Sequence, residues 1–277
     1  MEAVCIYPGS MGEIIQGNYK NIDVLLSCPI NLYTKVRVYE SNSVKNTENN
    51  FKAYNLMKRL LYSWGLEAYY NNLKINIISE LPREKGFASS TADLCGVYYS
   101  LVELFHKKIN KEELLKACIE IEPTDSILFN NFTILDYKTG KYKEDIGSYL
   151  EFYILVFEGN KKVNTIEFNK TVLRPLAKVD DLIYRANAAI QKRDIKSLAE
   201  ISTESITRNL HRLPYDYYEI INKIKTVNGG IGLIGAHSGD ALGIIFEDYE
   251  TAKETFENCK DSSKTNTYIV KTLKTIF

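Results

Sequence analysis

The sequence lacks the features that mark several common classes of protein. It contains no C-x-x-C pair, and its five cysteines are odd in number and widely scattered. This pattern argues against a disulfide framework or a structural zinc site and favours a reducing compartment. No apolar run approaches the ~20 residues of a membrane span, and the first residues lack the basic-then-apolar pattern of a secretory signal. We therefore expect a cytoplasmic protein with no membrane contact.

The chain also lacks net charge. Lys and Arg together number 35, and Asp and Glu together also number 35. A chain without a net positive field is not drawn to nucleic acid or to an anionic membrane. We expect no nucleic-acid partner, and a phosphate-bearing ligand would have to be held by local residues. The composition does not indicate whether the protein forms an oligomer.

The 277 residues are sufficient for a substantial core in two lobes. Period-two and helical patterns alternate along the chain, which indicates an α+β fold. The expected strands are residues 3–7, 22–30, 32–39, 73–78, 132–137, 150–157, 241–246 and 267–273. The expected helices are residues 51–64, 94–105, 111–121 and 249–258, with a mostly helical stretch over 171–226. We place the lobe boundary near Gly147, which gives domains 1–147 and 148–277.

A loop of small residues, PREKGFASSTAD at 82–93, follows one predicted strand and leads into a helix. Phosphate binding requires unobstructed backbone N–H groups and the positive end of a helix, and this segment can supply both. No Lys directly precedes the hydroxyl residues, so it is not a Walker loop. An ordinary helix start, capped by Ser or Thr, is the alternative. The predicted phosphate-binding residues are Pro82, Lys85, Gly86, Phe87, Ala88, Ser89, Ser90 and Thr91.

An acidic segment, EIEPTDS at 120–126, ends a predicted helix. Negative charge at a helix carboxyl terminus costs about 0.3–1 kcal/mol per group unless a cation compensates. A magnesium ion would compensate, although a solvated acidic helix end is the common alternative. Farther along, His237 lies in a small-residue turn where a functional role and a plain tight turn both stay open.

Three segments resemble, in order, the three motifs of the GHMP kinases, the superfamily of galactokinase, homoserine kinase, mevalonate kinase and phosphomevalonate kinase. They are PGSMGEIIQG at 8–17, the loop at 82–91, and GAHSGDALG at 235–243. The resemblance implies a two-lobed GHMP kinase fold. Its amino-terminal lobe would contain a left-handed βαβ crossover and bind ATP, and its carboxyl-terminal lobe would be ferredoxin-like.

Within that superfamily, the chain is most similar to the L-threonine kinases of cobalamin assembly and propanediol utilisation. The similar segments are PGSxGEIIQG, SCPINLYTKV, KGFASSTAD, EPTDS and GAHSGDALGIIF. The resemblance implies that ATP with Mg²⁺ phosphorylates the side-chain hydroxyl of L-threonine. The product, O-phospho-L-threonine, would serve the aminopropanol linker of the corrinoid. A kinase for serine, homoserine, ethanolamine or a similar acceptor, and a non-catalytic ATP-binding regulator, are the alternatives.

The resemblance also assigns roles to residues. Ser90 and Glu122 would lie near the metal, and Asp125 would accept the proton of the substrate hydroxyl or orient it; a turn-forming Asp is the alternative. A Gly86→Val substitution should abolish nucleotide binding and leave the fold intact. Asp240 brings a charge to the border of the pocket that could repel a substrate carboxylate. The predicted substrate contacts are Ser10, Glu13, Gln16, Cys28, His237, Ser238 and Gly239.

Overall fold

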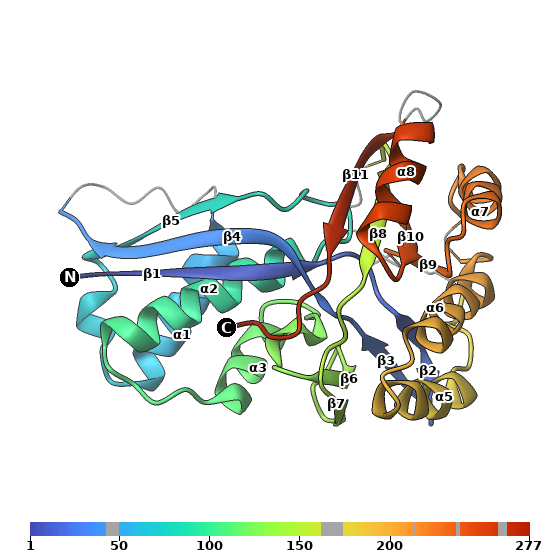
Figure 1. The fold of residues 1–277 in the computed structure, drawn as a ribbon. Helices are drawn as coiled ribbons and strands as arrows, with labels where there is room; N and C mark the ends of the chain where they lie inside the picture. Colours follow the sequence, from blue (N-terminus) through green and yellow to red (C-terminus); the bar gives the residue numbers. More distant parts are fainter. Residues whose placement is uncertain (43–49, 162–173, 213, 237–238, 260–264) are drawn as a thin grey trace.

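A computed structural model describes residues 1–42, 50–161, 174–212, 214–236, 239–259 and 265–277. It confirms the mixed helix and sheet class, with three antiparallel sheets in the described residues. Figure 1 shows how the helices pack against these sheets. In the described part of the chain, every helix is too short or too polar to cross a membrane.

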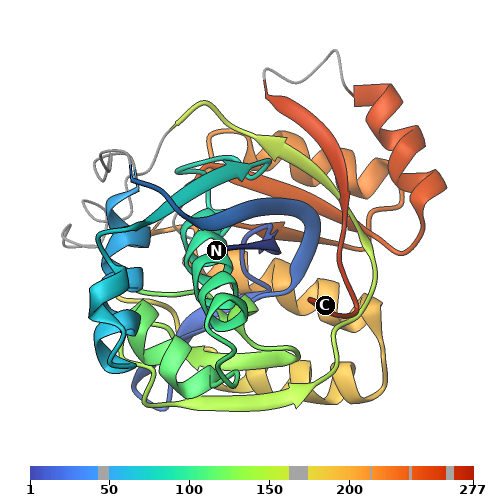
Figure 2. The same ribbon diagram turned by 90° about the vertical axis from the view of Figure 1, so that its left-hand side faces the viewer.

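The first sheet covers a nearly buried helix. Its strands, in spatial order, are β1 (Glu2–Ser10), β4 (Pro29–Glu40) and β5 (Leu73–Ser79). Helix α2 (Ser89–Leu104) packs against β1 and β4 so closely that a Cβ on Gly96 would lie 2.4 Å from a methyl of Val36. The helices α1 (Phe51–Ser63) and α3 (Lys111–Ile119) contact α2 from other sides. Most residues of α2 are buried, and Figure 2 shows α1 beside it.

The second sheet joins segments that are far apart in the sequence. Its strands, in spatial order, are β2 (Ile15–Tyr19), β3 (Ile22–Leu26), β6 (Phe132–Asp136) and β7 (Lys143–Gly147). Two helices from the second half of the chain, α5 (Asp180–Gln191) and α6 (Ile195–Asn209), pack against β2 (Figure 1). One hydrophobic core therefore includes residues from both sides of the predicted boundary near Gly147. That boundary stays a prediction.

The third sheet has the ferredoxin-like order. Its strands, in spatial order, are β11 (Asn266–Lys271), β8 (Tyr153–Glu158), β10 (Ala241–Phe246) and β9 (Gly232–Gly235). Helices α5, α6 and α7 (Tyr218–Val227) lie between β8 and β9 in the chain, and α8 (Tyr249–Cys259) lies between β10 and β11. This βαββαβ arrangement confirms the predicted carboxyl-terminal architecture. The handedness of the crossover in the amino-terminal half stays a prediction.

Several predicted boundaries were wrong for local reasons. The run expected over 22–30 breaks after Leu26, where the Ser27 amide donates to Ser126 Oγ at 3.0 Å instead of to a neighbouring strand. Strand β8 begins at Tyr153, three residues later than expected, and α3 ends at Ile119, two residues earlier. The sequence also failed to indicate β2, β7 and β9, together with the short 3₁₀ turns η1 (Glu67–Tyr69) and η2 (Ser126–Leu128).

The three motif segments meet through their backbones. The Ser10 amide donates to the Phe87 carbonyl, and the Gly12 amide donates to the Gly86 carbonyl, both at 3.1 Å. One residue later, the Glu13 amide donates to the Gly235 carbonyl at 3.1 Å. The first motif therefore lies between the second and the third. Backbone hydrogen bonds thus join three segments that are far apart in the sequence.

Gly12→Ala should destabilise the protein far more than Gly65→Ala. Both glycines have a positive φ, +63° at Gly12 and +69° at Gly65, so each alanine costs about 1–2 kcal/mol of backbone strain. A Cβ on Gly12 would also lie 2.4 Å from the carbonyl carbon and oxygen of Gly235, whereas Gly65 has no neighbour within 4 Å. In urea-induced unfolding, we expect Gly12→Ala to lower the free energy of unfolding by about 2 kcal/mol more than Gly65→Ala does. Equal losses would show that the contact between the first and third motifs is loose.

Candidate active site

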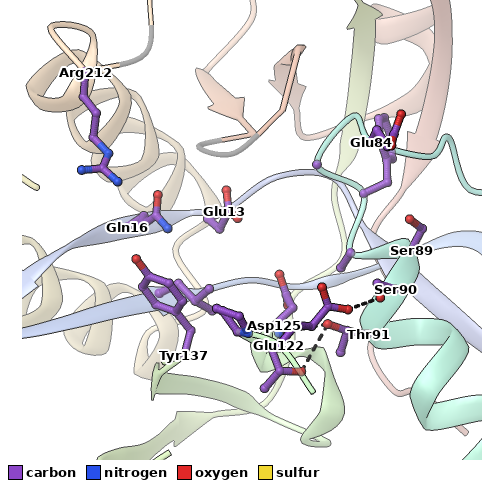
Figure 3. A pocket seen from close by; sticks show the side chains of 16 residues that line it. Glu13, Gln16, Glu84, Ser89, Ser90, Thr91, Glu122, Asp125, Tyr137 and Arg212 are labelled. Atoms are coloured by element: carbon purple, nitrogen blue, oxygen red, sulfur yellow. Dashed lines mark hydrogen bonds between the residues drawn. The ribbon is translucent and has the colours of Figure 1, made fainter. Parts of the chain in front are cut away.

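A cleft lies beside the point where the three motifs meet (Figure 3). It encloses about 850 Å³ of empty space, which includes the open mouth. The first motif, the loop before α2 and the acidic segment after α3 all contribute to its wall. The lining residues are Glu13, Gln16, Leu25, Glu84, Gly86, Phe87, Ala88, Ser89, Ser90, Thr91, Glu122, Pro123, Thr124, Asp125, Tyr137 and Arg212. The cleft therefore collects most of the predicted phosphate and metal residues and two of the predicted substrate contacts.

The amino terminus of α2 opens into this cleft without a side-chain cap. Its N-cap residue is Ala88, in the left-handed region at φ 51° and ψ 27°, and its methyl group can accept no hydrogen bond. Ser89, Ser90 and Thr91 come after the cap, inside the first turn. An ordinary helix start would place a Ser or Thr at the cap. The observed arrangement leaves first-turn N–H groups available to an anion.

The two predicted metal ligands lie together. Ser90 Oγ donates to Oε1 of Glu122, and Lys52 Nζ lies 2.7 Å from Oε2 of the same carboxylate. Magnesium commonly takes one or two protein oxygen ligands and completes its shell with phosphate oxygens and water, and this pair fits that requirement. Among the described residues, no group of three or more His, Cys, Asp or Glu side chains forms a metal cage.

Asp125 is fixed and buried at the base of the cleft. Its carboxylate accepts from the Ile127 amide at 3.0 Å and from Ser27 Oγ at 3.1 Å, while its own amide donates to Thr91 Oγ1 at 3.1 Å. Burial, with the added negative charge of Glu13, raises the pKa of Asp125 to about 7. A carboxylate whose pKa lies near neutral pH is suited to accept a proton from a hydroxyl group.

The other end of the cleft carries both signs of charge, from the Glu13 carboxylate and the Arg212 guanidinium. Figure 3 shows Gln16, Tyr137 and Arg212 at this end and Glu84, Ser89 and Ser90 at the opposite end, with Glu122 and Asp125 between them. Strand β2 is held here by α6, because the Gln16 amide donates to Ser205 Oγ at 3.1 Å.

Arg212 and Tyr137 were missed in the sequence, since each lies outside the three motifs. Arg212 donates to the Arg174 carbonyl, and its buried Nε has no hydrogen-bond partner among the described residues. Its position in the cleft depends on how the end of α6 packs, and no local pattern in the sequence signals that.

Several predicted residues lie outside the lining of the cleft. Ser10 and Cys28 are buried, and burial, followed by the charge of Asp125, raises the pKa of the Cys28 thiol well above its ordinary value. Lys85 donates its ammonium protons to the carbonyls of Gly159 and Lys161. Their roles, together with those of Pro82 and Gly239, stay predictions. His237 and Ser238 lie outside the described residues.

The structure bears on two expectations about single residues. A Cβ on Gly86 would lie 2.2 Å from Cβ of Ala236, so Gly86→Val would shift the third motif as well as the phosphate loop, and the intact fold expected of this variant stays a prediction. The carboxylate of Asp240 accepts from the Lys161 amide at 2.7 Å and from the Tyr217 hydroxyl at 3.0 Å. Asp240 thus stabilises the segment after β8 and does not line the cleft.

Asp125→Asn should stabilise the folded protein increasingly as pH rises. The pKa of Asp125 is about 7 in the folded protein against an ordinary value of 3.8, so ionisation of this group opposes folding. The wild type therefore loses stability between about pH 4 and pH 7, and the variant avoids this loss. Thermal unfolding at pH 5 and pH 8 measures the free energy of unfolding of the variant minus that of the wild type. This difference should be larger at pH 8 than at pH 5 by on the order of 2 kcal/mol.

Asp248→Asn is the matched control for that measurement. Asp248 is exposed and accepts from the Thr251 amide at 2.8 Å, and this hydrogen bond lowers the pKa of Asp248. Asp248 is ionised at both pH 5 and pH 8, so the stability difference between this variant and the wild type should be equal at the two values. The same constant difference for Asp125→Asn would contradict a raised pKa at Asp125.

Comparison with known proteins agrees with this geometry. The chain is 26% identical over 251 residues to the L-threonine kinase of Citrobacter freundii, covering 88% of this chain and 86% of that protein. It is 24% identical over 210 residues to a 4-diphosphocytidyl-2-C-methyl-D-erythritol kinase of Clostridium botulinum, covering 73% and 72%. A crystal structure of homoserine kinase from Cytophaga hutchinsonii superposes with a TM-score of 0.73 at 13% identity, over 99% of this chain and 95% of that one.

Two family descriptions match the chain directly. The GHMP kinases N terminal domain matches residues 50–129, which include α1, α2 and the acidic segment. The GHMP kinases C terminal domain matches residues 186–263, which include α6, α7, β9, β10 and α8. Together the two matches cover more than half of the chain. The protein belongs to the GHMP kinases.

Proposed function

We propose that this kinase transfers the γ-phosphate of ATP to the side-chain hydroxyl of L-threonine and gives ADP and O-phospho-L-threonine. The observation that carries the proposal is the cleft itself, in which an uncapped helix terminus, the Ser90–Glu122 pair and Asp125 lie together. The similarity to L-threonine kinases over most of both chains supports threonine as the acceptor. The product would serve the aminopropanol linker of the corrinoid.

The amino terminus of α2 would bind the phosphates. The small side chains of Gly86 and Ala88 let an oxygen atom approach the first-turn N–H groups, and the helix dipole favours negative charge there. Ser90 and Glu122 would hold Mg²⁺, which neutralises phosphate charge when it is bound. Positioning and charge neutralisation supply most of the catalysis, because phosphoryl transfer leaves little covalent work to the protein.

Asp125 would orient the acceptor hydroxyl and take its proton. The acceptor oxygen forms a bond to the γ-phosphorus, the bond between that phosphorus and the bridging oxygen breaks, and ADP leaves. The hydrogen bonds from Ile127 and Ser27 hold the carboxylate in one orientation. With a pKa of about 7, the group can be ionised before the transfer and protonated after it.

The far end of the cleft suits an amino acid acceptor. An amino acid presents an ammonium group that needs an acceptor and a carboxylate that needs donors. The Glu13 carboxylate lies in the lining and can accept from the ammonium group. The Arg212 guanidinium also lies there and can donate to the carboxylate. Asp240, which would repel a carboxylate, is turned toward Tyr217 instead.

Asp125→Asn should reduce turnover by about 10²–10⁴-fold, because the variant keeps the shape of the side chain and removes the proton acceptor. Affinity for ATP should stay within about twofold of the wild type. The wild-type kcat should fall below about pH 7 as Asp125 becomes protonated. Asp93→Asn is the control, since Asp93 is a buried carboxylate on α2 that pairs with Thr34 and Arg83 away from the cleft. Near-full turnover in Asp125→Asn would assign Asp125 a structural role only.

The acceptor can be identified with a coupled assay of ADP release. Purified protein is supplied with Mg·ATP and with L-threonine, L-serine, D-threonine, homoserine or ethanolamine. We expect a clear preference for L-threonine. A better rival would support a kinase for another small amino acid or amino alcohol. ATP binding without turnover on any acceptor would support a non-catalytic regulator.

Arg212→Met tests the amino acid end of the cleft in the same assay. The guanidinium would pair with the substrate carboxylate, so its loss should raise KM for L-threonine by about 10-fold or more. Ethanolamine has no carboxylate, and its KM should not change. An equal change for both acceptors would remove Arg212 from substrate recognition.

A further inference from the structure

The charge of the cleft does not suit a triphosphate on its own. Its lining includes four carboxylates, from Glu13, Glu84, Glu122 and Asp125, and within the described lining residues Arg212 is the lone Lys or Arg side chain. Figure 3 shows Arg212 at the end opposite Ser89 and Ser90. Like charges in a partly buried site repel each other strongly, so a nucleotide at the α2 terminus needs positive charge that the lining does not supply.

Lys52 brings positive charge to that end of the cleft from outside the three motifs. It lies in the first turn of α1, and its Nζ is 2.7 Å from Oε2 of Glu122 and 3.5 Å from Oγ of Ser90. The Glu122 side chain is 7% exposed, whereas the Lys52 side chain is 32% exposed. The carboxylate is therefore fixed in the wall, while the long lysine side chain reaches it from the solvent side and has room to move.

The predicted phosphate-binding lysine, Lys85, is not placed for this task. Its ammonium group is buried and donates to the carbonyls of Gly159 and Lys161. If the Lys85 ammonium group moved to the cleft, it would lose its hydrogen bonds to these two carbonyls. Ser10 in the first motif is neutral and buried. Lys52 is the lysine that already contacts both predicted metal ligands.

We propose that Lys52 is a phosphate-binding residue of this kinase, an inference that rests on the proposed ATP-dependent function. In the nucleotide-free protein, the Lys52 ammonium neutralises the Ser90–Glu122 pair. With nucleotide and Mg²⁺ bound at this site, the Lys52 ammonium would exchange Glu122 for a phosphate oxygen. A flexible four-carbon stem with three rotatable donors suits this exchange of partners.

Calorimetric titration with the β,γ-imido analogue of ATP, in the presence of Mg²⁺, tests the assignment. Lys52→Met should lower affinity for the analogue by about 10- to 100-fold, because a charge-assisted hydrogen bond to phosphate is lost. Affinity for adenosine, which has no phosphate, should stay within about twofold. Lys52→Arg should restore most of the affinity for the analogue. Lys58→Met is the matched control on the same helix, since Lys58 lies over the Tyr62 ring and should leave both affinities unchanged.

The outcomes separate the proposed residue from the proposed function. Wild-type protein that fails to bind the analogue would overturn the kinase proposal and Lys52 with it. Wild-type binding with unchanged affinity in Lys52→Met would overturn the Lys52 assignment alone. Equal weakening for the analogue and adenosine would also overturn it, because that pattern indicates a structural role. Lys52→Gln keeps a donor for Glu122 without the charge, and it replaces Lys52→Met if thermal unfolding shows that the Met variant does not fold.

Discussion

The close approach of three backbone segments is the constraint on which the site depends. The first motif donates amide hydrogen bonds to the Gly86 and Phe87 carbonyls on one side and to the Gly235 carbonyl on the other. Glycine is required where these segments touch, because a Cβ on Gly239 would lie 2.1 Å from the Lys85 carbonyl oxygen. The loop before α2 is thereby fixed in a left-handed turn at Ala88, and this turn leaves the helix terminus uncapped.

A second set of contacts connects the chemistry to this scaffold. Thr91 on α2 accepts from the Asp125 amide and lies 3.3 Å from the Thr124 hydroxyl, and Ser27 at the end of β3 donates to the Asp125 carboxylate. The proposed base is therefore held by the same helix whose terminus would bind the phosphates. Burial raises the pKa of Asp125 to about 7, and the wild type therefore loses stability as the pH rises from about 4 to about 7. Stability of this kind is commonly exchanged for function at active sites.

Membership of the GHMP kinases and choice of acceptor rest on different parts of the molecule. The fold is shared with the homoserine kinase structure at an identity of 13%, which shows the architecture alone. One fold supports many substrates because specificity depends on a few side chains at the site. The side chains that we propose recognise the acceptor lie at the Glu13 and Arg212 end of the cleft, away from the α2 terminus.

The sequence determined the features that depend on neighbouring residues. Helix α1 begins and ends within one residue of expectation, because its apolar spacing and the positive φ of Gly65 are local properties. The small-residue loop was found for the same reason, although α2 begins at Ser89, earlier than the expected 94–105. Tertiary structure decided the rest. Strand β2 forms where β3 and α6 pack beside it, and Lys85 turns toward the end of β8 while Lys52 and Arg212 reach the site from other elements. Long-range packing sets the direction of each of these side chains, and a local pattern contains no information about partners 38 to 76 residues away.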